Sequence, residues 1–281
     1  MMIKCLLLLS ILPVYASAVS LPDPLAVPGG IVHIPLGDAK LPMPQVFYQN
    51  HRVLVTQQNF KWLALVGIPL DATLGQQNIT IKTPKGDTPI SFQIMDKKYP
   101  AQYLKIKNKR MVNPNAADEK RISDDRIILN KALSTWTEQA TVDTDFIPPV
   151  EGRLSSLFGL KRFFNKQAKD PHGGLDIAAS AGTPIKAPAT ARVIDTGNFY
   201  YNGNTVLLDH GQGLISGYFH MTEIHVKPGQ QLKQGDILGT VGKTGRVTGP
   251  HLHWNIYLNN TKIDPALFIA RDIARLDARN K

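Results

Sequence analysis

Two short motifs hold the side chains of this sequence that are best suited to bind a metal ion. His172 and Asp176 form the first motif, and His251 and His253 form the second, much later in the chain. Two imidazole nitrogens and one carboxylate oxygen make an open ligand set for a catalytic zinc ion, with the fourth position left to water. The sequence therefore predicts a metal site, and the alternative is that each histidine is separately solvated or hydrogen-bonded.

The second motif begins a segment that alternates strictly between polar and apolar residues. Such alternation is typical of a strand with one buried face, so both histidines should point to the same side, away from the core. The polar face comprises His251, His253, Asn255 and Tyr257, and the apolar face comprises Leu252, Trp254, Ile256 and Leu258.

A third histidine-bearing segment, residues 214–221, shows the same pattern. Alternation places Ser216, Tyr218 and His220 on one face of a strand, with Ile215, Phe219 and Met221 on the other. We therefore expect three β-segments to present histidines to a single cleft. Gly242-Lys243-Thr244 looks like the end of a phosphate-binding loop, but Ile237 stands where that motif needs glycine.

With these motifs in place, residues 148–268 resemble the LytM-type (M23) family of zinc metallopeptidases. The resemblance implies an antiparallel β catalytic domain, zinc as cofactor and peptidoglycan stem peptides as substrate. It makes His172, Asp176 and His253 the metal ligands, and His220 and His251 the catalytic histidines that do not bind the metal. It rests on His172-x3-Asp176, Tyr218-Phe219-His220-Met221, Gly249-Pro250-His251-Leu252-His253-Trp254 and a frame that includes Gly152-Arg153-Leu154-Ser155-Ser156, Asp209-His210-Gly211 and Gly242-Lys243-Thr244-Gly245.

The two catalytic histidines have different expected roles. A zinc ion held by two neutral imidazoles and one carboxylate lowers the pKa of water from about 16 toward roughly 7. We expect His251 to be the general base, because it stands two residues from a ligand on the same strand face. His220 should stabilise the oxyanion of the tetrahedral intermediate. These two roles remain exchangeable at this stage.

The first eighteen residues have the features of a secretory signal peptide. Lys4 supplies the basic start, an apolar run follows, and Ala16-Ser17-Ala18 offers a cleavage site. The apolar run is too short for a permanent membrane span, so we expect no stable membrane anchor and a periplasmic or secreted mature protein. Cys5 is the only cysteine, so the mature chain should bind metal through nitrogen and oxygen alone.

The sequence predicts a mainly β protein with two domains. Residues 19–98 contain short β-rich pieces separated by turns, typical of a small β-sandwich. This domain is either a structural spacer or a regulator that contacts the catalytic groove. We expect a signal peptide at 1–18, the N-terminal β domain at 19–98, a partly helical connector at 99–140, the catalytic domain at 141–268 and a helical tail at 269–281.

The connector is strongly basic. From Lys97 to Lys131 it has ten Lys or Arg against four Asp or Glu. Residues 116–136 suit an amphipathic helix, through Ile122, Arg126, Ile127, Leu129 and Leu133. The charge is either a solvated face or an attraction to polyanionic cell-envelope material. No nucleic-acid recognition motif accompanies it, so nucleic acid is not an expected partner.

The expected reaction is hydrolysis of the D-alanyl to meso-diaminopimelate cross-link, as in envelope-exported relatives that share the segment Asn108-Lys109-Arg110-Met111-Val112-Asn113-Pro114. The rival hypothesis is a non-catalytic protein that binds the envelope or activates an amidase. An intact ligand set argues against that rival.

Overall fold

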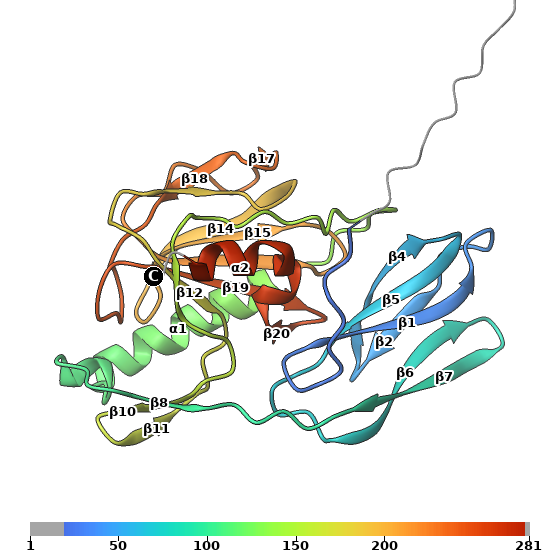
Figure 1. The fold of residues 1–281 in the computed structure, drawn as a ribbon, viewed down its shortest axis with the longest axis horizontal. Coiled ribbons are helices and arrows are strands. Elements are labelled where there is room, and N and C mark those ends of the chain that lie inside the picture. Colours follow the sequence, from blue (N-terminus) through green and yellow to red (C-terminus); the bar gives the residue numbers. More distant parts are fainter. Residues whose placement is uncertain (1–19, 279–281) are drawn as a thin grey trace, which may run out of the picture.

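The structure is a computed structural model that describes residues 20–278. It consists of an N-terminal β domain and a larger C-terminal β domain, joined by a connector that carries one long helix (Figure 1). The predicted signal peptide lies outside the described residues. No helix within them combines the length and the apolar character that a membrane crossing requires.

The N-terminal domain is a sandwich of two antiparallel sheets, in agreement with the prediction. One sheet has the strand order β1-β5-β4 and the other the order β3-β2-β6-β7. Val46, Ile79 and Phe92 of the second sheet pack against Val55 and Ala64 of the first. The strands are β1 (Ile31–Asp38), β2 (Gln45–Tyr48), β3 (His51–Arg52), β4 (Leu54–Gln58), β5 (Lys61–Gly67), β6 (Gly75–Thr83) and β7 (Gly86–Ile94).

Strand β5 is buried on both faces, which explains its uninterrupted apolar sequence. Ala64 and Val66 point into the sandwich, whereas Leu63 and Leu65 join the core of the C-terminal domain. The sandwich is therefore docked on the C-terminal domain through one of its own sheets, and the two domains share a continuous core.

Two side chains of the C-terminal domain stabilise this contact. Each forms hydrogen bonds to the backbone nitrogen and oxygen of one residue, as a paired strand would. The buried amide of Asn259 accepts a hydrogen bond from the Gly67 nitrogen at 2.7 Å and donates one to the Gly67 oxygen at 3.0 Å. Gln212 does the same for the nitrogen and oxygen of Val55, at 2.9 and 3.0 Å. Buried backbone groups at the interface thereby keep hydrogen-bond partners.

The C-terminal domain is built on an eight-stranded, antiparallel sheet in the order β17-β14-β15-β16-β19-β12-β9, with β20 paired to β19. A second small sheet pairs β13 with β18. The elements are β9 (Arg153–Ser156), β10 (Lys161–Phe164), β11 (Gln167–Lys169), β12 (Leu175–Ala178), β13 (Pro184–Lys186), β14 (Ala191–Phe199), β15 (Gly203–Asp209), β16 (Ile215–Met221), β17 (Gln231–Leu232), β18 (Ile237–Thr240), β19 (Leu252–Leu258), β20 (Thr261–Ile263), η2 (Pro265–Phe268) and α2 (Ala270–Ala278).

The alternation expected for residues 251–258 is present in β19, whose apolar residues Leu252, Trp254, Ile256 and Leu258 are fully buried in the core. In β16 the expected alternation holds from Ile215 to Phe219 and is wrong from His220 onward. Tyr218 pairs with Trp254 on the core face, while Phe219 pairs with His253 on the opposite face.

His220 reaches the side of His253 because its backbone is left-handed, with φ of 65°. This conformation is uncommon for a residue other than glycine, and it breaks the two-residue period. Ser216 and Tyr218 do not face the cleft with His220, as the alternation had predicted. They are fully buried and hydrogen-bonded to each other at 2.9 Å.

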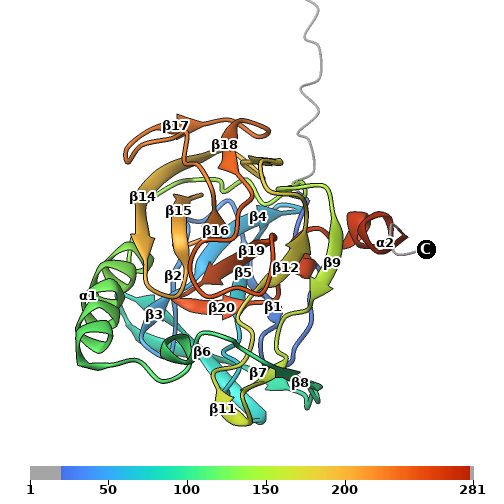
Figure 2. The same cartoon turned by 90° about the vertical axis from the view of Figure 1, so that its left-hand side faces the viewer.

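The connector runs along the C-terminal domain. It contains β8 (Ala101–Leu104), which pairs in parallel with β10, then η1 (Lys109–Met111) and α1 (Ala116–Leu133). Helix α1 begins with a capping box between Asn115 and Asp118. Figure 2 shows α1 beside β14.

The inward side of α1 differs from the predicted one. Leu129 and Ala132 pack on Leu207 and Phe219 of the sheet. Ile127, one of the residues named for the amphipathic helix, is 66% exposed. It is two positions from Leu129, and positions that far apart on a helix do not share a face.

Candidate metal centre and groove

Two neighbouring strands of the large sheet bring the first and second motifs together. Strands β12 and β19 are antiparallel neighbours, and their register pairs Asp176 directly with His253. His172 lies in the turn that leads into β12. Residues far apart in the sequence thus become adjacent because side chains of directly paired residues stand on the same face of a sheet.

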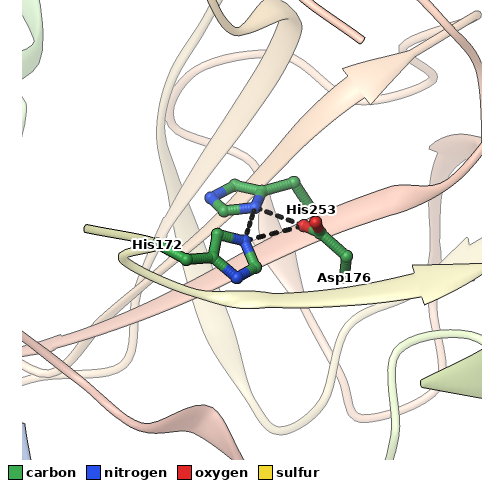
Figure 3. A group of neighbouring side chains, drawn as sticks. All are labelled: His172, Asp176 and His253. Atoms are coloured by element: carbon green, nitrogen blue, oxygen red, sulfur yellow. Dashed lines mark hydrogen bonds and ion pairs between the residues drawn. The ribbon is translucent and has the colours of Figure 1, made fainter. Parts of the chain in front are cut away.

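The three side chains converge on one point (Figure 3). Their ligand atoms all lie within 4.8 Å of one another. His172 Nε2 is 2.9 Å from His253 Nδ1 and 2.9 Å from Asp176 Oδ1, and His253 Nδ1 is 2.6 Å from the same oxygen. Figure 3 shows the two imidazole rings and the carboxylate turned toward one another.

The donor set fits a zinc ion. His172 Nδ1 lies 2.7 Å from the Leu157 carbonyl oxygen, so this nitrogen carries the ring proton and the Nε2 lone pair faces His253. Lone pairs that point at one another repel unless a cation or a proton lies between them. Nitrogen and carboxylate oxygen ligands of this kind, with a carbonyl behind one imidazole, are typical of zinc sites.

Asp176 remains ionised although it is buried. Burial alone would raise the pKa of its carboxyl, but the adjacent His253 and His172 rings hold that pKa well below its ordinary value. Arg162 adds an ion pair, with its Nη2 3.1 Å from Asp176 Oδ2. The site therefore keeps a negative charge available for a cation.

His220 and His251 stand beside this centre. The two rings are 5.0 Å apart between centroids, and the His220 ring is 5.9 Å from that of His253. His251 Nε2 is 3.8 Å from Asp176 Oδ1. The structure thus brings all five predicted residues together, from β12, β16, β19 and the turns next to β12 and β19.

Both histidines are oriented by carbonyl oxygens of one loop, residues 242–251. His220 Nδ1 donates to Thr244 oxygen and His251 Nδ1 donates to Gly249 oxygen, each at 2.9 Å. This leaves the Nε2 lone pair of each ring free to accept a proton. Burial, reinforced by the charges of His253 and His251, lowers the pKa of His220 to about 3, so this ring is neutral at neutral pH.

His210 belongs to a different place in the molecule. It directly follows β15 and is buried in the core beside the ring of Phe146. Its Nδ1 donates to Thr190 oxygen at 3.0 Å, and its Nε2 lies 2.8 Å from Ser216 Oγ. Burial lowers its pKa to about 4.

A groove of about 590 Å³ leads to the centre and is lined by His172, His220 and His253. One of its walls is the connector helix, through Ile122, Leu129 and other residues of α1. Within the described part of the chain, no residue of the N-terminal domain lines this groove. Of the two alternatives for that domain, spacer or regulator, this lining does not support a direct contact with the groove, whereas the connector forms one of its walls.

Sequence reasoning gave no role to several residues in and beside the groove. Thr244, which it placed in the frame of the resemblance and in a false phosphate-binding motif, orients His220 through its carbonyl. Arg162 and Arg246 were not singled out, although both line the groove. No motif signals them, because their partners are distant in the sequence.

A large antiparallel sheet that carries His-x3-Asp and His-x-His motifs in this arrangement defines a metallopeptidase domain. Residues 170–265 match the profile of Peptidase family M23, and residues 25–97 match the Peptidase family M23 N-terminal domain. A crystal structure of a Pseudomonas aeruginosa protein assigned to peptidase M23 is 39% identical, covers 87% of this chain and 95% of its own, and superposes with a TM-score of 0.74. The chain belongs to peptidase family M23.

Relatives named for an activity match part of this chain. The peptidoglycan DD-endopeptidase ShyA of Vibrio cholerae is 37% identical over 113 residues, which is 40% of this chain and 26% of ShyA. The DD-carboxypeptidase/endopeptidase Mpg of Neisseria meningitidis is 35% identical over 118 residues, 42% of this chain and 27% of Mpg. The matched region thus spans about a quarter of the length of these relatives.

Proposed function

We propose that this protein is a zinc-dependent endopeptidase that hydrolyses peptide cross-links in peptidoglycan. The observation that carries the proposal is the convergence of His172, Asp176 and His253, with His220 and His251 beside them. Family membership and the similarity to the peptidoglycan DD-endopeptidase ShyA and the DD-carboxypeptidase/endopeptidase Mpg support the same substrate class.

His172, Asp176 and His253 would hold the zinc ion, which would supply the positive charge that acidifies a water molecule and polarises the scissile carbonyl. The protein holds these ligands in place through the strand pairing of β12 with β19 and the carbonyl behind His172. Arg162 fixes the second oxygen of Asp176, so that Oδ1 stays directed at the two imidazoles.

His251 is the proposed general base. Its Nδ1 is engaged with Gly249 oxygen, so its Nε2 is the atom that accepts the proton of the attacking water. His220 is neutral at neutral pH and presents the same kind of acceptor. It becomes a hydrogen-bond donor to the developing oxyanion only after it takes up a proton, and exchange of roles between the two histidines leaves the geometry unchanged.

The proposed bond is the D-alanyl to meso-diaminopimelate cross-link of Gram-negative peptidoglycan. Support comes from the similarity to ShyA of Vibrio cholerae, which is named a peptidoglycan DD-endopeptidase. A site of action in the periplasm is part of the proposal and follows from the predicted signal peptide.

The experiment that tests the proposal combines metal analysis with product identification. Purified mature protein should contain one zinc per chain and should release soluble muropeptides from sacculi, with loss of cross-linked dimers in the mass spectrum. Zinc-loaded protein that leaves the dimers undiminished would favour the rival role as a non-catalytic envelope protein. Preferential cleavage of pentaglycine would exclude the proposed bond.

A further inference from the structure

The groove carries more positive than negative side chains. Five lysines and arginines line it, against two aspartates. Coulomb attraction in a partly desolvated groove is stronger than in bulk water, so such a lining favours an anionic ligand. The cations are Arg126, Arg162, Lys169, Arg246 and Lys262, and the aspartates are Asp125 and Asp170.

Arg246 stands out among these cations. Arg162 is paired with Asp176, and the Lys169 ammonium donates to Val112 oxygen at 2.9 Å, whereas Arg126 and Lys262 are exposed to solvent. Arg246 is half-buried, and among the described residues no carboxylate forms an ion pair with it. The charge of Asp170 acts on it only from beyond ion-pair distance. A desolvated cation without an anionic partner is costly unless a ligand supplies one.

The Arg246 guanidinium is held in a fixed position by aromatic rings. Its central carbon lies 4.0 Å from the centroid of Tyr201 and 4.9 Å from that of Phe164. One of its nitrogens donates to Met111 oxygen in the connector at 3.3 Å. A guanidinium has five N–H donors, and within residues 20–278 a single one of them has a protein acceptor. The remaining donors are preorganised for a planar, two-pronged acceptor such as a carboxylate.

Arg246 also lies within the catalytic machinery's own loop. It stands between Thr244, whose carbonyl orients His220, and Gly249, whose carbonyl orients His251. The groove that it lines also contains His220 and His253. A ligand group bound at Arg246 is therefore in the same groove as the reacting bond.

We infer that Arg246 binds a carboxylate of the substrate peptide and so selects acidic stem peptides over neutral bridges. This inference rests on the proposed function and adds a specificity-determining residue to it. Stem peptides that contain glutamate and diaminopimelate offer such carboxylates, whereas an oligoglycine bridge offers none within its length. A charge-assisted, two-pronged hydrogen bond of this kind contributes roughly 10- to 100-fold in binding.

The test compares two substrates and four forms of the zinc-loaded mature chain. The substrates are a cross-linked muropeptide dimer with free carboxylates and the same dimer with its carboxylates converted to carboxamides. The forms are the wild type, Arg246→Gln, Arg246→Lys and, as matched control, Arg153→Gln, which removes an exposed arginine outside the groove. We expect Arg246→Gln to raise KM for the carboxylate dimer about 10- to 100-fold and to change KM for the amidated dimer little.

Arg246→Lys keeps the charge and should retain part of the preference, and Arg153→Gln should retain all of it. If Arg246→Gln raises KM equally for both dimers, Arg246 only holds the loop. If the wild type has the same KM for both dimers, no carboxylate is recognised. Either result overturns the inference. If Arg246→Gln does not fold, Arg246→Lys is used instead, and the ratio of its KM values for the two dimers is compared with that of the wild type. An equal ratio overturns the inference.

Failure of the proposed function is recognised separately. If zinc-loaded wild type releases no product from either dimer, calorimetric binding of the two dimers replaces KM. Tighter binding of the carboxylate dimer that is lost in Arg246→Gln would then support the inference, and equal binding would overturn it.

Discussion

Replacement of Asn259 by glycine should loosen the docking of the two domains. The buried side chain makes both hydrogen bonds to the Gly67 backbone, and its φ of 39° means that glycine removes the amide without adding backbone strain. Each buried backbone group left without a partner costs about 1–3 kcal/mol. We therefore expect the free energy of unfolding to fall by roughly 2–6 kcal/mol, the sum over the two groups.

The assay is urea unfolding of the zinc-loaded protein, with Asn260→Gly as the matched control. Asn260 is the next residue of the same turn, also has positive φ at 60° and is exposed, so its loss should cost less than about 1 kcal/mol. Activity per folded molecule should not change in Asn259→Gly, because the N-terminal domain does not line the groove. Equal stabilities of the two variants would refute the reasoning, and a rise in kcat/KM would show that the N-terminal domain restrains the enzyme.

Three further predictions concern the histidines. His251→Ala should lower kcat about 10²- to 10⁴-fold, because the general base is lost. Zinc content should stay at one per chain, because His251 is not a ligand, and loss of zinc would reverse the assignment of ligand and base. Chelation should abolish hydrolysis and lower the melting temperature, because zinc binds the folded chain, whereas a chelator-insensitive melting temperature would contradict the site. The pKa of His210 is about 4 in the folded chain against an ordinary 6.5, so the unfolded chain binds this proton at higher pH than the folded chain does. The free energy of unfolding should therefore fall by roughly 3 kcal/mol as the pH drops from the ordinary value to the folded one. His210→Gln should flatten this part of the stability–pH curve, and an unchanged slope would contradict the burial of a neutral His210.

Regular β-structure was predictable from the sequence where a strand has one buried face. In β19 the four apolar residues occupy the core, and His253 points to the metal centre as the alternation predicted. In β16 the same rule failed, because it assumes an unbroken extended backbone. The left-handed backbone of His220 depends on contacts with Asn202 and Thr244, which the local sequence does not encode.

Contacts between distant segments account for the other differences. The apolar run of β5 predicted a buried strand, but not that Leu63 and Leu65 would enter the core of the other domain. The helix of the connector was predicted with nearly its observed range, whereas its position along the groove depends on packing against Leu207 and Phe219. Arg246 acquires its role only from three-dimensional neighbours.

The loop of residues 242–251 has a consequence for how this enzyme can be altered or can diverge. Its backbone orients both catalytic histidines, while the side chain of Arg246 faces the groove. An insertion or deletion here would displace two carbonyl oxygens at once and misalign both rings, whatever it did for substrate choice. A new specificity is therefore reached by exchanging side chains at constant loop length, or by changing residues of α1 that line the groove. Grafting a longer or shorter loop from a relative should yield proteins that bind zinc but have a low kcat.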